Sequence, residues 1–532
     1  MIRLIATRKI SALGLLLLLA ACAVGPNYHA PGVSALGVPP RYSAAAPEGQ
    51  LPDLKRWWGQ FDDPMLGWLV DRALGANLDI AQAVARLRQA RAAVTIARAD
   101  LLPSVEGSAG AGRNFQNHGS DTSSFSVGAD ANWAIDLFGG TRRSIEASRA
   151  DLEAAGYDLG SVQAAIAAET ARNFVALRDA QARLAVARDV LRTQDDNLHI
   201  AGWRVQAGLV SSLDVESAKT QRAQTAATIP TLDTAIAAAE NRLAVLIGVA
   251  PGTLAAELAD IRNIPRAPGD IAVGIPADTL RNRPDVRVAE RNLAAATARI
   301  GVAKAQLFPA LSISGNVGTS ALALGSLGDI VTGGLFAGLS QIIFDGGRRA
   351  ANVHSNEAAA EGALAVYRKT VLTALEDVEN GLVALKAARD RQVFLATGLD
   401  AANTSALLAR SQYRAGLTDF QTLLDAERQL LSARDGLVSA KADEADALIQ
   451  LYLALGGGWD PAAQVSINDS PPCKGGAGGG CARLRAGMLF PERTVELAMS
   501  GASSPRHCLP TPNPSLAGRG VLSGDLKKRL DS

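Results

Sequence analysis

The chain of 532 residues is too long for one small domain, and its 53 basic and 52 acidic side chains nearly cancel. Because this balance lacks the basic excess of proteins that bind nucleic acid, we exclude nucleic acid as a partner. Aromatic residues make up 4% of the chain, whereas alanine is frequent and favours long helices. One cysteine is Cys22, and the others lie beyond residue 470. The body of the protein therefore has neither a disulfide framework nor a cysteine-based metal site.

Residues 1–21 have the pattern of a bacterial signal peptide. A positively charged start precedes an apolar run of ten residues, which is too short to cross a bilayer. The run ends in Leu-Ala-Ala before Cys22, and this ending resembles a lipobox. The resemblance implies cleavage before Cys22 and its acylation, with palmitate among the acyl groups. Residue 23 is Ala rather than Asp, which by resemblance to lipoprotein sorting permits passage to the outer membrane. The alternative is an ordinary signal peptide with a chance cysteine.

Segments of unusual composition flank the body of the chain. Residues 22–60 are predicted to be a lipid-anchored N-terminal tether, because five prolines between residues 23 and 50 favour extended backbone. Residues 461–532 are rich in glycine and proline without periodicity, so we predict a disordered C-terminal tail. The alternative for this tail is a segment that binds a partner.

The body of the chain repeats itself. Pro309 follows Pro103 by 206 residues, and each ends a predicted helix. Phe344 follows Phe138 by the same 206 residues, and each precedes glycines and a pair of arginines. The tripeptide Ala-Gly-Leu recurs with an offset of 208 residues. The chain is therefore predicted to be two similar halves in tandem.

Each half is predicted to contain a helix, a β-hairpin and two long helices. We place repeat 1 at residues 61–250, an equatorial linker at 251–284 and repeat 2 at 285–460. The elements of repeat 1 are a helix at 78–101, a hairpin at 104–138 and long helices at 143–207 and 212–247. The elements of repeat 2 are a helix at 285–307, a hairpin at 311–344 and long helices at 349–414 and 419–455.

The strands imply an oligomer. From Phe125 to Leu137 the odd positions are apolar over thirteen residues, enough to cross a bilayer when tilted. Four strands cannot close a barrel, and an open sheet in lipid would leave unpaired edges. We therefore expect three copies to form a 12-stranded transmembrane β-barrel, and their twelve long helical runs to form an α-helical barrel continuous with it. The alternative, a soluble coiled coil, does not account for the strands.

Several motifs together resemble the TolC-like outer-membrane factors of resistance-nodulation-division efflux pumps. Besides the lipobox, they lie at residues 133–139, 283–286, 413–416, 423–428 and 453–459. The resemblance implies a lipid-anchored homotrimer in the outer membrane with a periplasmic extension. It also implies a periplasmic adaptor and an inner-membrane pump as partners, and export of small toxic compounds. The alternative function is the outer-membrane duct of a type I protein secretion system, and an adhesin or structural lipoprotein is a third.

A periplasmic gate is expected near the start of the last helix. Gln421, Asp425 and Arg428 follow one another at spacings of four and three, which places them on one stripe. Three-fold symmetry would bring three copies of Asp425 toward one axis. The resemblance implies that Asp425, Arg428 and Tyr413 form the constriction, with Asp214 as an inter-helix partner. The alternative is an ordinary surface ion pair.

The reversals between the long helices are the expected docking points for the adaptor. The resemblance places these tips farthest from the membrane, and glycine allows the chain to reverse there. The tip residues are Gly208, Leu209 and Ser212 in repeat 1, and Gly416, Leu417 and Thr418 in repeat 2.

An enzyme is not expected. The histidines are scattered and form no zinc or catalytic-triad pattern, and no phosphate-binding loop is present. We therefore predict no catalytic residue, no metal and no cofactor other than the covalent lipid on Cys22. The histidines are His29, His118, His199, His354 and His507.

Overall fold

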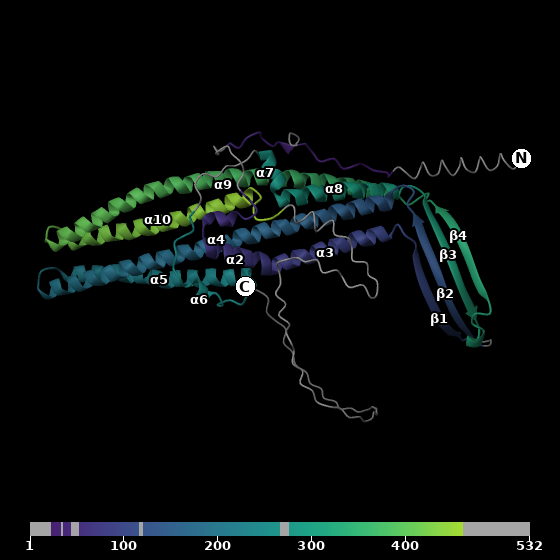
Figure 1. Cartoon of the computed structure of the whole chain (residues 1–532), viewed down its shortest axis with the longest axis horizontal. Coiled ribbons are helices and arrows are strands. Elements are labelled where there is room, and N and C mark those ends of the chain that lie inside the picture. Colours follow the sequence, from purple (N-terminus) through teal and green to yellow (C-terminus); the bar gives the residue numbers. More distant parts are fainter. Residues whose placement is uncertain are drawn as a thin grey trace, which may run out of the picture. The chain divides into compact units, whose positions relative to one another are not determined.

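Long helices and one small sheet make up the computed structural model (Figure 1). It describes residues 23–32, 36–43, 53–115, 117, 121–266 and 276–460. The predicted signal peptide, Cys22 itself and the predicted tail lie outside the described residues. The helices are α2 (Pro64–Ala76), α3 (Leu78–Ala99), α4 (Gly140–Gln206), α5 (Ser212–Leu246), α6 (Ala255–Leu258), α7 (Pro276–Asn282), α8 (Pro284–Ala305), α9 (Arg348–Arg414) and α10 (Phe420–Ala454), with short 3₁₀ helices η2 (Trp57–Phe61) and η3 (Leu324–Ser326).

The two halves have the predicted plan. Each consists of a 22-residue helix, two strands, a 67-residue helix and a 35-residue helix. The long helices α4 and α9 follow glycines in the left-handed region, Gly139 (φ 79°) and Gly347 (φ 85°). The shorter α5 and α10 begin at side-chain caps, Ser211 and Asp419, which accept hydrogen bonds from backbone amides of the first turn. The predicted mixed α and β fold with two tandem repeats is confirmed.

The four strands form one antiparallel sheet in chain order. They are β1 (Ser104–Asn114), β2 (Thr122–Ile135), β3 (Ala310–Ala321) and β4 (Val331–Ser340). The strands of the two halves meet where β2 pairs with β3, with Gly128 opposite Gly318 and Trp133 opposite Ile313. Strand β1 pairs only with β2, and β4 only with β3, within the described residues. Both outer edges of this sheet are therefore open in the single chain.

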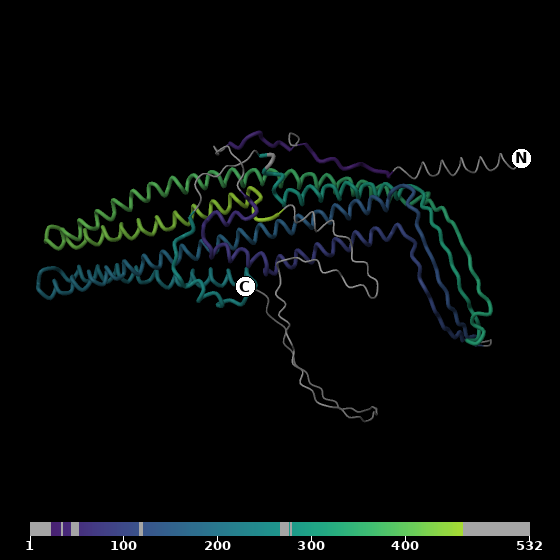
Figure 2. Tube along the Cα trace, viewed as in Figure 1, coloured from purple at the N-terminus to yellow at the C-terminus, as the bar shows by residue number. Residues whose placement is uncertain are grey.

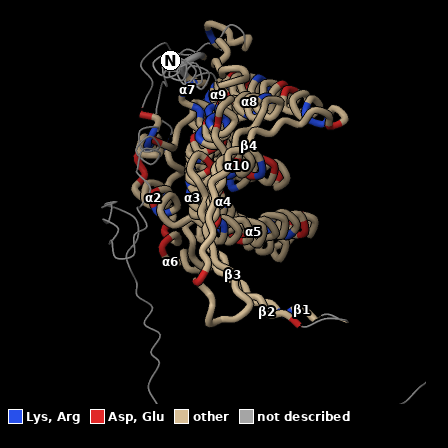
Figure 3. The backbone as a smooth tube through the Cα atoms, turned by 90° about the vertical axis from the view of Figure 1, so that its right-hand side faces the viewer, with Lys and Arg blue, Asp and Glu red and all other residues tan. Residues whose placement is uncertain are grey.

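The sheet has no apolar layer packed against it in the described chain. Every residue of β1 is exposed, and apolar side chains of the sheet such as Val127 and Leu335 are exposed as well. Strands β3 and β4 carry no charged side chain, whereas Lys, Arg, Asp and Glu are abundant on the helices (Figure 3). This sheet presents apolar side chains on its surface without the core that a soluble sheet requires.

The hairpins α4–α5 and α9–α10 run to the end of the described chain opposite the sheet (Figure 2). Ion pairs join them along their length: Arg183 bonds Asp435 at 2.7 and 3.0 Å, and Arg434 bonds Asp189 at 2.9 Å. No helix among the described residues combines the length and apolar character needed to cross a membrane.

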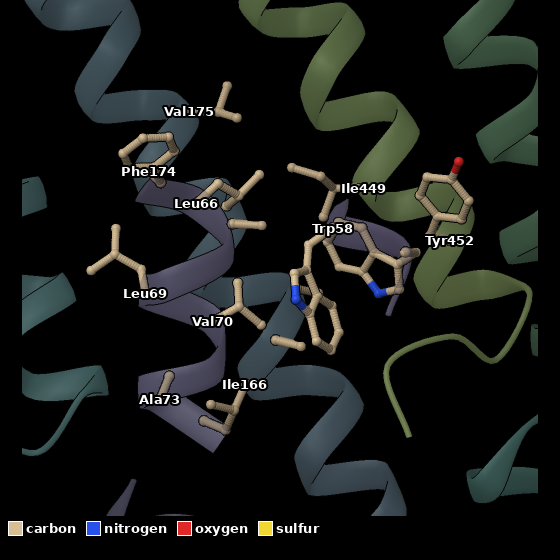
Figure 4. Packing of buried hydrophobic residues seen from close by; sticks show 14 of the residues in the cluster. Trp58, Leu66, Leu69, Val70, Ala73, Ile166, Phe174, Val175, Ile449 and Tyr452 are labelled. Atoms are coloured by element: carbon tan, nitrogen blue, oxygen red, sulfur yellow. The ribbon is translucent and has the colours of Figure 1, made fainter. Parts of the chain in front are cut away.

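The main core lies in the middle of the helices and includes the last residues of the segment that was predicted to be a tether. Trp57, Trp58 and Phe61 of η2 are buried in a cluster with residues of α2, α4 and α10. Figure 4 shows Trp58 among the side chains of these helices. Trp57 stacks on Tyr452 with ring centroids 5.4 Å apart. The prediction that the tether extends to residue 60 was therefore wrong, because burial of these three aromatic side chains makes the end of that segment part of the core.

Candidate gate and tip sites

Both helical tips are reversals at glycines. Gly208 (φ 71°) and Gly416 (φ 73°) adopt the left-handed conformation that glycine allows without strain. Leu209 and Leu417 donate their amides to Arg204 O and Gln412 O, both at 2.9 Å, and these bonds satisfy carbonyls at the helix ends. A Cβ at either glycine would have no heavy atom within 4 Å. Leu209, Ser212 and Leu417 are exposed, and Thr418 is half-buried. The tips are therefore free surfaces of the described chain.

The predicted stripe on α10 forms a hydrogen-bonded group. Arg428 Nη1 donates to Asp425 Oδ1 at 2.8 Å, and Gln421 Nε2 donates to the same oxygen at 3.1 Å. Both charged side chains are about half exposed. Arg428 Nη2 also reaches Gln221 Oε1 on α5 at 3.4 Å. The inter-helix contact of Arg428 in this chain is thus with Gln221 rather than with Asp214.

Tyr413 belongs to a separate, more buried group than the stripe on α10. The Tyr413 ring is buried against Phe420, with centroids 5.2 Å apart, and the guanidinium of Arg204 lies 4.3 Å from its centre. Burial raises the pKa of the Tyr413 hydroxyl; the charge of Arg204 opposes this shift and that of Asp214 adds to it. Tyr413 therefore packs between α4 and the start of α10, whereas the Asp425 stripe faces outward.

A buried carboxylate near the tips was not among the predicted site residues. Glu427 is only 4% exposed and accepts hydrogen bonds from Asn197 Nδ2 at 2.6 Å and from Arg410 Nη2 at 3.1 Å. These partners lie on α4 and α9, so Glu427 joins three helices. The signal in the sequence is that Glu427 follows Leu423 and Leu424 by four and three residues, which puts a charge on the apolar face of α10.

Two similar halves that join a strand hairpin to very long helices define a tubular channel subunit, and the comparisons identify its family. A sequence profile described as "Outer membrane efflux protein" matches residues 69–249 and 275–457, and the chain belongs to this family. It is an outer-membrane efflux channel subunit with a periplasmic extension.

Relatives match the chain over nearly their whole length. Nodulation protein T of Rhizobium leguminosarum bv. trifolii is 34% identical over 463 residues, covering 85% of this chain and 97% of the relative. Outer membrane protein OprJ of Pseudomonas aeruginosa is 30% identical over 482 residues, covering 86% and 98%. The solved structure of the outer-membrane channel OprN has a TM-score of 0.75 at 36% identity and covers 83% of this chain and all of that one.

Proposed function

We propose that three copies of this chain form one passive duct, anchored to the outer membrane by acylated Cys22, that receives small toxic compounds from an inner-membrane pump through a periplasmic adaptor. The observation that carries this proposal is the four-stranded sheet with two open edges. In lipid, unpaired backbone groups at such edges cost several kcal/mol each. Pairing β4 of one copy with β1 of the next satisfies both edges, and three copies give twelve strands.

The helices support the same assembly. Helix α9 exposes apolar side chains along its length, including Val366, Leu372, Val383, Phe394 and Leu408. A soluble monomer rarely presents so long an apolar stripe to water, so we assign it to contact with a neighbouring copy. In this arrangement the helices form a wall around a channel, and the duct needs no catalytic residue.

The gate and the adaptor contacts are assigned to the tips. Three copies of the exposed Asp425–Arg428 pair around one axis would repel through like charges unless each carboxylate keeps its arginine. We assign Gln421, Asp425, Arg428, Tyr413 and Asp214 to the closed constriction. The exposed reversals at Gly208 and Gly416 are assigned to adaptor docking, because they present surface that neither packing nor strand pairing uses.

The class of cargo follows from the relatives. Relatives that match 83% or more of this chain include an antibiotic efflux pump outer membrane protein, a solvent efflux pump outer membrane protein and a pyoverdine export outer membrane protein. These names describe small organic compounds rather than proteins.

Drug susceptibility tests the proposal. Deleting the gene should lower the minimal inhibitory concentrations of several unrelated antibiotics or dyes, and the wild-type gene should restore them. If the deletion strain keeps its drug susceptibility but no longer secretes one particular protein, the function would be type I protein secretion and not efflux. In parallel, the wild-type protein should incorporate labelled palmitate and Cys22→Ser should not; label retained in Cys22→Ser would exclude acylation at this residue.

A further inference from the structure

The chain immediately after Cys22 is held at the junction between the sheet and the helices. We call residues 23–28 the anchor segment. Its residue Val24 donates its amide to Phe138 O at 3.1 Å, just beyond the end of β2. Arg143, in the first turns of α4, donates from Nε to Val24 O at 3.3 Å and from Nη2 to Gly25 O at 3.2 Å. The anchor segment is therefore bound through its backbone.

The side chain of Arg143 is committed to this contact. Its Nη2 also donates to Asn27 Oδ1 at 2.7 Å, and its Nη1 pairs with Glu146 at 2.7 Å. The side chain is only 6% exposed. Buried charges in proteins need hydrogen-bond partners, and three of the four bonds of this guanidinium go to the anchor segment. Without that segment, most of the hydrogen bonds of Arg143 would be lost.

Two glycines leave the space that the anchor segment fills. A Cβ at Gly139 would lie 2.6 Å from Cα and Cβ of Ala23. A Cβ at Gly301, on α8, would lie 2.9 Å from Val24 O and 2.8 Å from Cγ of Arg143. Neither distance is compatible with a side chain, so both positions admit the backbone of the anchor segment only because they are glycine.

The far end of the anchor segment is fixed by Tyr28. Its hydroxyl donates to Glu290 Oε1 at 3.4 Å, and the guanidinium of Arg291 lies 5.7 Å from the centre of its ring. Burial raises the pKa of the Tyr28 hydroxyl, and the charge of Glu290 adds to this shift. The anchor segment is thus held at both of its ends.

Among the described residues, no segment docks in this way at the corresponding junction of half two. Arg349 donates to Gln306 O and pairs with Asp345, and its side chain is 26% exposed. A Cβ at Gly346 or Gly347 would have no heavy atom within 4 Å. A strand-to-helix turn of this kind therefore does not by itself require the close contact that Gly139 makes with Ala23 in half one.

We propose that Gly139, Arg143 and Gly301 form a docking site for the anchor segment, and that this site fixes the position of the N-terminal lipid at the sheet–helix junction of its own chain. The proposal rests on the acylation of Cys22 proposed above. A free tether of about 35 residues would let the lipid move over roughly 30 Å. A docked segment instead fixes Ala23, the residue to which the acylated cysteine is directly bonded, and so limits how far the lipid can move.

The test measures docking and lipid position separately, in the full-length protein in membranes. Hydrogen exchange of the Val24 amide, which donates to Phe138 O, should be slow in the wild type and at least tenfold faster in Arg143→Gln. Asn27→Ala, which leaves α4 and α8 intact, should give a smaller acceleration, and Arg349→Gln is the matched control with no change. Cys22→Ser should keep the protection, because the contacts come from residues 23–28.

Lipid position is read by a photoactivatable palmitate analogue incorporated at Cys22. In the wild type, crosslinks should concentrate on residues 133–142 and 300–310; in Arg143→Gln they should scatter. Two results in wild-type protein that carries the label would overturn the docking site but leave acylation standing. One is fast hydrogen exchange of the Val24 amide, and the other is crosslinks scattered over the chain. Protected residues with no label would instead overturn acylation at Cys22 and, with it, the anchoring role.

Discussion

The two halves of the chain differ in how their tips are packed, although their helices have equal lengths. In half two, the first turns of α10 bury Phe420, Leu423 and Leu424 against the neighbouring helices. In half one, the corresponding turns of α5 leave Leu213 exposed, contribute the small buried side chain of Ala218 to the same cluster, and carry an exposed ion pair, Lys219–Glu216 at 2.7 Å. The two repeats have the same order of elements, but the tip of half two buries large apolar side chains and the tip of half one packs more loosely.

This difference shows how a repeated fold acquires a specialised site. The packed tip holds its outward stripe in a defined orientation, because the opposite face of α10 is fixed in the core. The loose tip has an ion pair of similar exposure but no comparable support at the start of its helix. If this asymmetry determines channel closure and stability, substitutions at the two tips should have different effects.

The largest effect is expected from the ion pair on the packed tip. The double substitution Asp425→Ala, Arg428→Ala should raise the conductance of purified channels in a planar bilayer several-fold, because it removes the charges that we assign to the closed constriction. Stability should change by less than about 1 kcal/mol, since exposed pairs contribute little. The control is Glu216→Ala, Lys219→Ala, an i,i+3 pair of similar exposure on the loose tip. Equal conductance in the two double mutants would exclude the gate.

A glycine at a tip and a glycine just beyond the C-terminal end of α10 should respond differently. Gly456 (φ 81°) would place a Cβ 2.7 Å from Asn282 O, whereas Gly416 has open space. Gly456→Leu should lower stability by about 3 kcal/mol through backbone strain and overpacking, and reduce the yield of trimers. Gly416→Leu should add only about 1–2 kcal/mol of strain and should lower efflux while trimers still insert. Immunoblots of trimers and susceptibility assays measure the two effects, and loss of trimers in Gly416→Leu would show that this tip serves folding.

Removing the buried carboxylate should destabilise the packed tip. Glu427→Ala leaves Asn197 and Arg410 without their shared partner and should lower the free energy of unfolding by about 2 kcal/mol. Glu427→Gln should be intermediate, because an amide oxygen can still accept from Asn197. Thermal unfolding in detergent measures the change, with the exposed Glu216→Ala as control. If both alanine variants melt at the same temperature, the three-helix junction contributes nothing to stability.

The smallest effect is expected at Asp179 on α4. Burial raises the pKa of this carboxyl; Arg183 opposes the shift, and the charges of Asp435 and Asp443 add to it. The folded state therefore binds this proton more tightly than the unfolded state, so ionised Asp179 lowers stability at pH 7 and the penalty disappears as pH falls through the folded pKa. Asp179→Asn should raise the melting temperature at pH 7 by a few degrees at most. A stabilisation that persists unchanged at pH 3 would contradict this assignment.

The sequence predicted most of the fold because its signals are local. Pro103 and Pro309 end helices through their own backbone, and alternation from Phe125 onward needs only neighbouring residues. Gln421, Asp425 and Arg428, which we assign to the gate, lie within one helix, so their grouping was also predictable. The observed starts of the long helices lie within three residues of the predicted ones.

What the sequence left undetermined depends on distant partners. Glu427 bonds Asn197 across 230 positions, and Arg143 bonds Val24 across 119. No periodicity within one segment indicates such pairs. The aromatic residues of η2 were assigned to the tether for the same reason, because their partners lie on helices far along the chain. The contact of Arg428 with Gln221 likewise requires the packing of α5 against α10.

The aromatic stack of Trp57 on Tyr452 has a consequence for the order of folding. The same tyrosine bonds Gln60, which is 392 positions away, so the core cannot close until almost the whole chain has crossed the inner membrane. Contacts of such separation form late, because the entropy of a long loop must be overcome first. We therefore expect the α4–α5 hairpin to form early and to await α10, with its apolar side chains exposed to the periplasm in the interval. We therefore expect any need for a holding chaperone to be greatest in the interval before α10 is delivered.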